Sequence, residues 1–264
     1  MTTLHAEREV ITGLLDRAAD ALRSKFRTAL RFETKDAAGR DAVTEADLAS
    51  ERILVAGLHE SFPEDAILSE ESAAPTASAA RTWIVDPLDG TNNFRQGIPL
   101  FCISAALWQD ARPVLGAIRS VLDDELFLAE RGQGASLANQ PTRVGPAADI
   151  ASIRASCDSG VSDEQRARAG RAFARLAPRV RGIRVIGSAA LSLAYVACGR
   201  FDAYWNAAML HPWDVAAGVL LVSEAGGRVS RVDGSEVGLE PGTVVASNGR
   251  VHDDLLAAIQ ESRS

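Results

Sequence analysis

The stretch WIVDPLDGTNNF, residues 83–94, decides the fold. The apolar residues 82–85 predict a short buried strand that ends before Pro87. Asp86 and Asp89 then leave the end of that strand, with Pro87 fixing a turn between them. Two carboxylates that converge so closely repel each other, and a hard divalent cation relieves the repulsion. The stretch therefore indicates a metal site, although Pro, Asp and Gly also make ordinary turns.

The two residues that follow favour phosphate as a ligand. Gly90 lets the backbone approach a ligand closely, and successive N–H groups after it can bind a phosphate. The hydroxyl of Thr91 can hold a water within hydrogen-bond distance.

Three further acidic segments support a metal site, although each has an ordinary explanation. Glu70 lies in ILSEES (67–72) at the end of a short apolar strand, where a solvated loop is the alternative. Asp214 lies in HPWDVAAGVLLVSEAGG (211–227), where a helix N-terminal acid is the alternative. Asp47 lies in DAVTEAD (41–47), a capping-box pattern.

Hydrophobic periodicity predicts an α+β half joined to an α/β half. Helices are expected over residues 4–27, 44–59, 162–176, 188–198 and 213–225, with Asn248 capping a last helix. Further strands are expected over 66–69, 101–107, 114–121, 125–129, 153–156, 184–186, 202–205 and 243–246, and loops over 33–40 and 72–80. We expect an N-terminal half over 1–147 and a C-terminal half over 148–264, forming one compact unit.

Composition disfavours several function classes. The formal net charge of −7 gives no basic face for nucleic acid, so we expect no nucleic-acid partner. An acidic protein that binds an anionic substrate needs local positive charge, and a bound metal is the simplest source. The charged N-terminus and the lack of a long apolar run predict a cytoplasmic protein without a membrane partner. The 3 dispersed cysteines predict reduced thiols.

Together these segments resemble the inositol monophosphatase family, within the lithium-sensitive, magnesium-dependent phosphatase superfamily. WIVDPLDGTNNF resembles the first signature of that family, and PWDVAAGVLLVSEAGG (212–227) resembles the second. ILSEES and DAVTEAD match two weaker family segments in the expected order. The resemblance runs from about residue 5 to about residue 260 and implies an α+β fold with layers α-β-α-β-α, of the inositol monophosphatase and fructose-1,6-bisphosphatase type.

The resemblance also implies roles for individual residues. The implied metal ligands of two or three Mg²⁺ ions are Glu70, Asp86, Asp89, Asp214 and the backbone carbonyl of Leu88. The implied catalytic residues are Thr91, Asp47 and Glu70, with Thr91 and Asp47 orienting the attacking water. The implied substrate site contains Asp89, Gly90, Thr91, Gly187, Ser188, Ala189, Asn206 and Asp214.

The implied activity is Mg²⁺-dependent hydrolysis of a small phosphate monoester by metal-activated water. Inositol monophosphate is the first substrate candidate, and a histidinol, sugar or nucleotide phosphate is the alternative. Family members are commonly homodimers, so a homodimer is expected. A non-catalytic regulatory or binding protein on the same scaffold is the alternative of another class, and the presence of all four carboxylates and Thr91 disfavours it.

One segment departs from the family. Inositol-specific members usually carry a Glu several residues before the second signature, where it hydrogen-bonds substrate hydroxyls. Residues 204–210 read YWNAAML here, so Asn206 or Ala207 stands at that place in a segment one residue longer. Sites that bond particular hydroxyls discriminate strongly between substrates. The phosphate end of the predicted site therefore matches the family, whereas the alcohol end differs.

Overall fold

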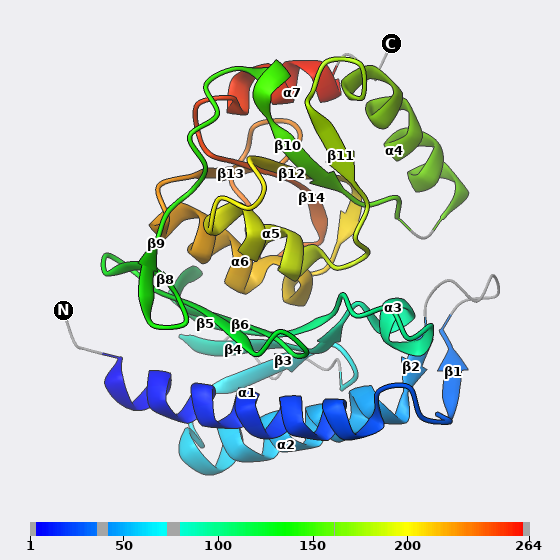
Figure 1. The fold of residues 1–264 in the computed structure, drawn as a ribbon. Coiled ribbons are helices and arrows are strands. Elements are labelled where there is room, and N and C mark those ends of the chain that lie inside the picture. The colour runs from blue at the N-terminus through cyan, green and yellow to red at the C-terminus, as the bar shows by residue number, and fades with distance from the viewer. Residues whose placement is uncertain (1–3, 36–41, 73–79, 161, 261–264) are drawn as a thin grey trace.

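Five layers of helices and sheets stack on one another in the computed structural model, which describes residues 4–35, 42–72, 80–160 and 162–260 (Figure 1). The first layer contains helices α1 (His5–Lys25) and α2 (Glu45–Ser61). The middle layer contains α5 (Ala189–Ala197) and α6 (Pro212–Glu224), and the last contains α4 (Asp163–Leu176) and α7 (His252–Gln260). A sheet lies between each pair of helical layers, which confirms the predicted α+β fold.

The first sheet has, among the described residues, seven strands in the order β3-β4-β5-β6-β7-β8-β9. These strands are β3 (Ala66–Ser69), β4 (Arg81–Asp89), β5 (Cys102–Gln109), β6 (Arg112–Ser120), β7 (Glu125–Glu130), β8 (Gly134–Leu137) and β9 (Gln140–Thr142). Strand β3 runs parallel to β4, and the remaining neighbours are antiparallel, so the predicted meander is confirmed.

The second sheet is mixed, with the order β11-β10-β12-β14-β13 in the described chain. Its strands are β10 (Arg154–Cys157), β11 (Gly182–Arg184), β12 (Ala203–Leu210), β13 (Arg228–Ser230) and β14 (Gly242–Ser247). The shorter elements are the pair β1 (Phe32–Thr34) and β2 (Ala42–Thr44), helix α3 (Thr91–Arg95) and a 3-10 turn (Ile150–Ser152).

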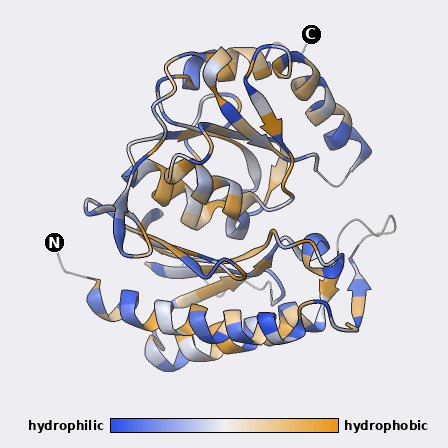
Figure 2. Cartoon of the chain, viewed as in Figure 1, coloured by the Kyte–Doolittle hydropathy of each residue, from blue (hydrophilic) through white to orange (hydrophobic). Residues whose placement is uncertain are grey.

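Buried apolar residues form three clusters, which contain residues from the sheets and from the helices packed on them. Figure 2 colours the chain by the hydropathy of each residue. Successive residues of β4 point to opposite faces of the sheet, as a strand requires. Trp83 and Val85 pack with the apolar residues of α1 and α2, whereas Ile84 packs with those of α5 and α6. Strand β4 is therefore buried on both faces, and its C-terminal end is held between two helical layers.

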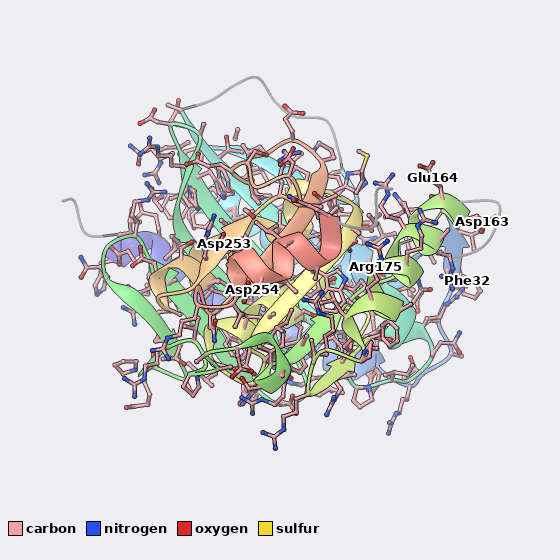
Figure 3. All side chains as sticks on the ribbon, turned by 90° about the horizontal axis from the view of Figure 1, so that it is seen from above. Phe32, Asp163, Glu164, Arg175, Asp253 and Asp254 are labelled. Atoms are coloured by element: carbon pink, nitrogen blue, oxygen red, sulfur yellow. The ribbon has the colours of Figure 1, made fainter. Side chains whose placement is uncertain are left out.

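Charges at the helix ends complement the helix dipoles in the outer layer. Figure 3 looks down on this layer, with Asp163 and Glu164 at one end of α4 and Arg175 toward the other. The two acids lie in the first turn and Arg175 in the last turn, where each charge is favourable. Asp253 and Asp254 lie in the first turn of α7 in the same way.

Two expectations about strand ends are wrong. Strand β4 does not end before Pro87 but continues to Asp89. Its register against β5 shifts between Asp86 and Asp89, and such an irregularity accommodates a proline, which has no N–H to donate. Strand β12 runs on to Leu210, well past the expected end at residue 205.

Other boundaries also differ from the sequence prediction. The strand expected over 184–186 is β11, at Gly182–Arg184. Asn248 does not cap α7; its side chain accepts from Arg250 N–H and donates to the carbonyls of Gly145 and Ala147. The polar stretch 33–40 overlaps the unpredicted strand β1, and β2, β8, β9 and β13 were also not predicted. Residues 36–40 and 73–79 of the two expected loops lie outside the described residues. No helix in the described chain is both long and apolar enough to span a membrane.

Candidate metal and phosphate site

Three aspartates from two distant segments meet at the C-terminal end of β4. Asp86 and Asp89 come from β4, and Asp214 comes from the first turn of α6. One carboxylate oxygen from each lies within 4.8 Å of the others. Asp86 and Asp89 are only 1% and 8% exposed. The structure therefore brings together three of the four carboxylates that the sequence singled out.

Different donors hold each carboxylate in place. The Leu88 N–H donates to Asp86 Oδ1 at 3.0 Å. The Ser188 hydroxyl and the Ala190 N–H both donate to Asp89 Oδ2, at 2.5 and 2.7 Å. The His211 N–H donates to Asp214 Oδ2 at 2.7 Å, so Asp214 is a helix-capping acid as well as a cluster member.

The three carboxylates disfavour one another's charge. Burial is the largest cause, and it raises the pKa of Asp86 well above its usual value, with the charges of Glu70, Asp89 and Asp214 adding to the shift. Burial also raises the pKa of Asp89 to about 6, although its hydrogen bonds from Ser188 and Ala190 oppose the shift. The pKa of Asp214 is raised well above normal, first by burial and then by Asp89. Such a cluster favours a cation.

Glu70 lies beside this cluster and pairs with a lysine. Lys35 Nζ lies 2.8 Å from a carboxylate oxygen of Glu70 and 2.8 Å from one of Glu71. The charge of Glu70 raises the pKa of Asp86 and Asp214, so all four predicted carboxylates share one electrostatic environment. Burial raises the pKa of Glu71 to about 7, partly offset by Lys35.

Thr91 and Asp47 are distant in the sequence but form a hydrogen bond. The Thr91 hydroxyl donates to Asp47 Oδ1 at 2.9 Å and also lies 3.0 Å from the Leu88 carbonyl. Asp47 is fully buried, and its other oxygen accepts from the N–H and hydroxyl of Thr44 at the start of α2. The capping box predicted for α2 and the contact with Thr91 therefore use the same carboxylate.

Gly90 permits the sharp turn between β4 and α3. Its φ of +97° is in the region that favours glycine. A Cβ at this position would lie 3.0 Å from the Leu100 carbonyl oxygen and 3.2 Å from Phe101 Cβ. Ser50 of α2 donates to the Pro87 carbonyl at 2.7 Å and fixes the same turn from the other side.

A cavity of about 390 Å³ opens beside the aspartates. Of the predicted substrate residues, Asp89, Gly187, Ala189, Asn206 and Asp214 line it. Ser188 is 1% exposed and caps α5 while donating to Asp89, so it supports a carboxylate from behind. The remaining lining residues were not predicted: Asn92, Asp158, Ser159, Gly160, Arg166, Val185 and Leu210.

The part of the predicted site that would bind the substrate alcohol contains the segment 204–210, where the sequence departs from the family. Asn206 is 2% exposed, and its Oδ1 accepts from the Ala208 N–H at 2.7 Å. The register of β12 against β14 shifts between Asn206 and Leu210, where the sequence predicts one extra residue. Sequence reasoning missed Asp158 and Lys35, because neither lies in a motif and both act through contacts distant in the chain.

Comparison with known proteins agrees with this geometry. The sequence profile described as "Inositol monophosphatase family" matches residues 4–264. The chain belongs to the inositol monophosphatase family. It is similar to inositol monophosphatase 2 of Solanum lycopersicum, with 37% identity over 254 residues that cover 93% of this chain and 95% of the relative. It is also similar to inositol-1-monophosphatase of Mesorhizobium japonicum, with 41% identity over 228 residues and 85% coverage of both chains.

Solved structures of this family share the fold. The crystal structure of the extragenic suppressor protein suhB of Bartonella henselae matches with a TM-score of 0.91 and 33% sequence identity. That match covers 97% of this chain and 99% of the other. The inositol monophosphatase of Anabaena matches with a TM-score of 0.86 and 32% identity, covering 98% and 97% of the two chains.

Proposed function

We propose that this member of the inositol monophosphatase family hydrolyses a small phosphate monoester with the help of Mg²⁺, and that inositol monophosphate is its substrate. The observation that carries the proposal is the convergence of Asp86, Asp89 and Asp214 beside a cavity. The names of the two curated relatives support the choice of inositol monophosphate.

The donor set fits the proposed metal. Mg²⁺ prefers oxygen ligands and is bound in phosphoryl-transfer sites by a few carboxylates together with substrate oxygens. We propose that Asp86, Asp89, Asp214, Glu70 and the Leu88 carbonyl hold two or three ions. When bound, these ions would supply positive charge that polarises the phosphoryl group and makes a water more acidic.

Thr91 is proposed to orient the attacking water. Its hydroxyl can donate to Asp47 Oδ1 at 2.9 Å or to the Leu88 carbonyl at 3.0 Å, and in either case its oxygen can accept a hydrogen bond from a water. Asp47 is held by Thr44 and cannot turn away. The charge of Glu70 helps to raise the pKa of Asp47, so Glu70 acts on the same place and is proposed to share the task of orienting the water.

The backbone after β4 is proposed to bind the phosphate. The turn at Gly90 presents the N–H groups of Gly90 and Thr91, and such groups stabilise negative charge on phosphoryl oxygens. Gly187, Ala189 and Asn206, which line the cavity, are proposed to contact the substrate, with Ser188 positioning Asp89.

Phosphate release measures the proposed activity directly. Wild-type protein would be incubated with inositol 1-phosphate, histidinol phosphate, fructose 1,6-bisphosphate and a nucleoside monophosphate, each with Mg²⁺ or with EDTA. We expect Mg²⁺-dependent release from inositol 1-phosphate that falls by at least about 100-fold in Asp89→Asn. Asp110→Asn is the matched control, because Asp110 is exposed at the tip of the β5–β6 hairpin. Near-normal turnover by Asp89→Asn would refute the scheme, and Mg²⁺ binding without any turnover would favour a regulatory role.

Three wider features belong to the same proposal. We propose a cytoplasmic homodimer, and light scattering of the purified protein would give its mass in solution. The free thiols of Cys102, Cys157 and Cys198 are compatible with a reducing compartment. We also propose that residues 1–147 and 148–264 form one compact unit, because one buried apolar cluster contains residues from both halves.

A further inference from the structure

We propose that Asp158 and Arg166 recognise neighbouring hydroxyl groups of the substrate alcohol, with Asp158 as the hydroxyl acceptor and Arg166 as the hydroxyl donor. Both residues line the cavity that also contains Asp89 and Asp214. This role rests on the phosphatase activity proposed above, because it assigns the leaving alcohol to the part of the cavity away from the aspartate cluster.

Asp158 is held firmly while part of its carboxylate remains available. The Tyr204 hydroxyl donates to Oδ2 at 2.7 Å, and the Gly187 N–H donates to Oδ1 at 3.2 Å. An ionised carboxylate offers about four acceptor positions, so two remain after these bonds. Tyr204 is fully buried on β12, which fixes the carboxylate at the cavity wall.

Asp158 is distinct from the metal cluster. The oxygens that lie within 4.8 Å of one another belong to Asp86, Asp89 and Asp214. The charge of Asp158 nevertheless raises the pKa of Asp89 and of Asp214, so it acts on the same cavity. Because a carboxylate repels a phosphate, we assign Asp158 to the part of the substrate next to the phosphate rather than to the phosphate itself.

Arg166 supplies the complementary donor. It lies in the first part of α4 and is exposed, and among the described residues its guanidinium makes a long contact of 3.5 Å from Nη1 to Ser159 Oγ. A hydrogen bond of that length is weak, so the guanidinium can turn toward a ligand.

The pairing of these two side chains selects one chemical class. A hydroxyl can donate to Asp158 and accept from Arg166, and neighbouring hydroxyls can use both side chains at once. An ammonium group can satisfy only Asp158 and is repelled by Arg166. A second phosphate or a carboxylate can satisfy only Arg166 and is repelled by Asp158. The cavity therefore favours a phosphate monoester of a neutral polyol over one of an amino alcohol or a bisphosphate.

The side chain at the expected hydroxyl-binding place is less suited to this task. Asn206 lines the cavity, but its Oδ1 already accepts from the Ala208 N–H at 2.7 Å. Asp158 follows the end of β10, the strand beside β12, and so reaches the cavity from a different segment of the chain.

Steady-state kinetics with Mg²⁺ would test this role in wild type, Asp158→Asn, Arg166→Gln and Arg171→Gln. Arg171 is an exposed arginine of α4 that does not line the cavity, so it is the matched control. The substrates are inositol 1-phosphate, histidinol phosphate, fructose 1,6-bisphosphate and 4-nitrophenyl phosphate, whose leaving group has no hydroxyl substituent. The measured quantity is kcat/KM for each ester relative to 4-nitrophenyl phosphate.

We expect Asp158→Asn to lower the ratio for inositol 1-phosphate by about 10- to 100-fold, mainly through KM, because a hydrogen bond to a charged group is lost. Arg166→Gln should lower it by about 3- to 10-fold, and Arg171→Gln should leave it unchanged. An unchanged ratio in Asp158→Asn would overturn the assignment. A loss confined to histidinol phosphate in Asp158→Asn, or to fructose 1,6-bisphosphate in Arg166→Gln, would overturn the choice of hydroxyls.

Calorimetric binding of inositol 1-phosphate separates this role from the phosphatase activity. Weaker binding by Asp158→Asn than by wild type, without turnover by either, would support the role of Asp158 and reject the proposed function. Equal binding by both proteins would reject the role of Asp158 whether or not the wild type is active.

Discussion

Replacing Asp86 by Asn is expected to make the metal-free protein more stable while abolishing its activity. Asp86 is 1% exposed, and its carboxylate oxygen lies within 4.8 Å of oxygens of Asp89 and Asp214. Two unit charges at that separation repel by about 3 kcal/mol at an effective dielectric constant of about 20. The hydrogen bond from the Leu88 N–H opposes the rise in the pKa of Asp86, and an amide oxygen can accept the same bond.

The size of the gain depends on pH. The pKa of Asp86 is raised in the folded protein from its ordinary 3.8, so the folded state holds a proton that the unfolded state releases. Wild-type stability is therefore lost as the pH rises above about 4. We expect Asp86→Asn to gain roughly 1–3 kcal/mol at pH 7.5, and little at about pH 3, because the carboxyl is then largely protonated in both states.

Thermal unfolding in EDTA and in Mg²⁺ provides the assay. A gain of 1 kcal/mol corresponds to a rise of about 2–4 °C in Tm for a chain of this size. Mg²⁺ should raise the Tm of the wild type more than that of the variant, because the variant lacks one ligand. Asp110→Asn, at an exposed hairpin tip, should stay within about 0.5 kcal/mol of wild type. A variant less stable than wild type in EDTA at pH 7.5 would refute the account of charge repulsion.

Three further predictions concern other parts of the molecule. Thr91→Val should lower kcat by about 100-fold or more and lower the Tm by a few degrees, because the buried Asp47 loses a donor. Thr91→Ser should retain most activity, and equal kcat values for the two variants would contradict the role of the hydroxyl. Gly90→Ala should lower the free energy of unfolding, measured in urea, by about 1–3 kcal/mol, because the φ of Gly90 is +97° and the new Cβ would lie 3.0 Å from the Leu100 carbonyl oxygen. A variant as stable as wild type would show that the turn relaxes without cost. Burial lowers the pKa of His252 to about 4, so the unfolded state binds the proton first and stability falls by at most about 3 kcal/mol as the pH drops from 6.5 to 4. In urea unfolding, His252→Gln should lose less free energy of unfolding than wild type over this pH range. His59→Gln, at an exposed site, is the control and should lose as much as wild type. Identical losses in all three proteins would contradict the prediction.

Local signals in the sequence were sufficient for much of the fold. The start of α2 was predictable because Thr44 and Asp47 form a capping box within one turn. The strand β4 was predictable from its apolar run, but its end was not. Pro87 normally ends a strand, and only pairing with β5 revealed the irregularity that allows it to continue.

The candidate site was predictable only as far as its motifs extend. Asp86, Asp89 and Asp214 lie in recognisable signatures, so the resemblance placed them together before any contact was known. The pairing of Lys35 with Glu70 spans 35 residues, and that of Tyr204 with Asp158 spans 46. Such contacts depend on how the layers stack, which no local pattern encodes.

The middle helical layer explains how the protein tolerates its buried charges. The first turns of α5 and α6 both reach the end of β4, where Ala190 N–H donates to Asp89 and His211 N–H donates to Asp214. Helix N-termini favour negative charge, so these two carboxylates are partly stabilised without a cation. Asp86 lies on the strand itself and accepts from the Leu88 N–H, so, in the described part of the chain, its charge is not stabilised by a helix N-terminus in the same way. The same arrangement that makes Asp86 costly to the fold makes it available to a metal, and this is why one substitution is expected to move stability and activity in opposite directions.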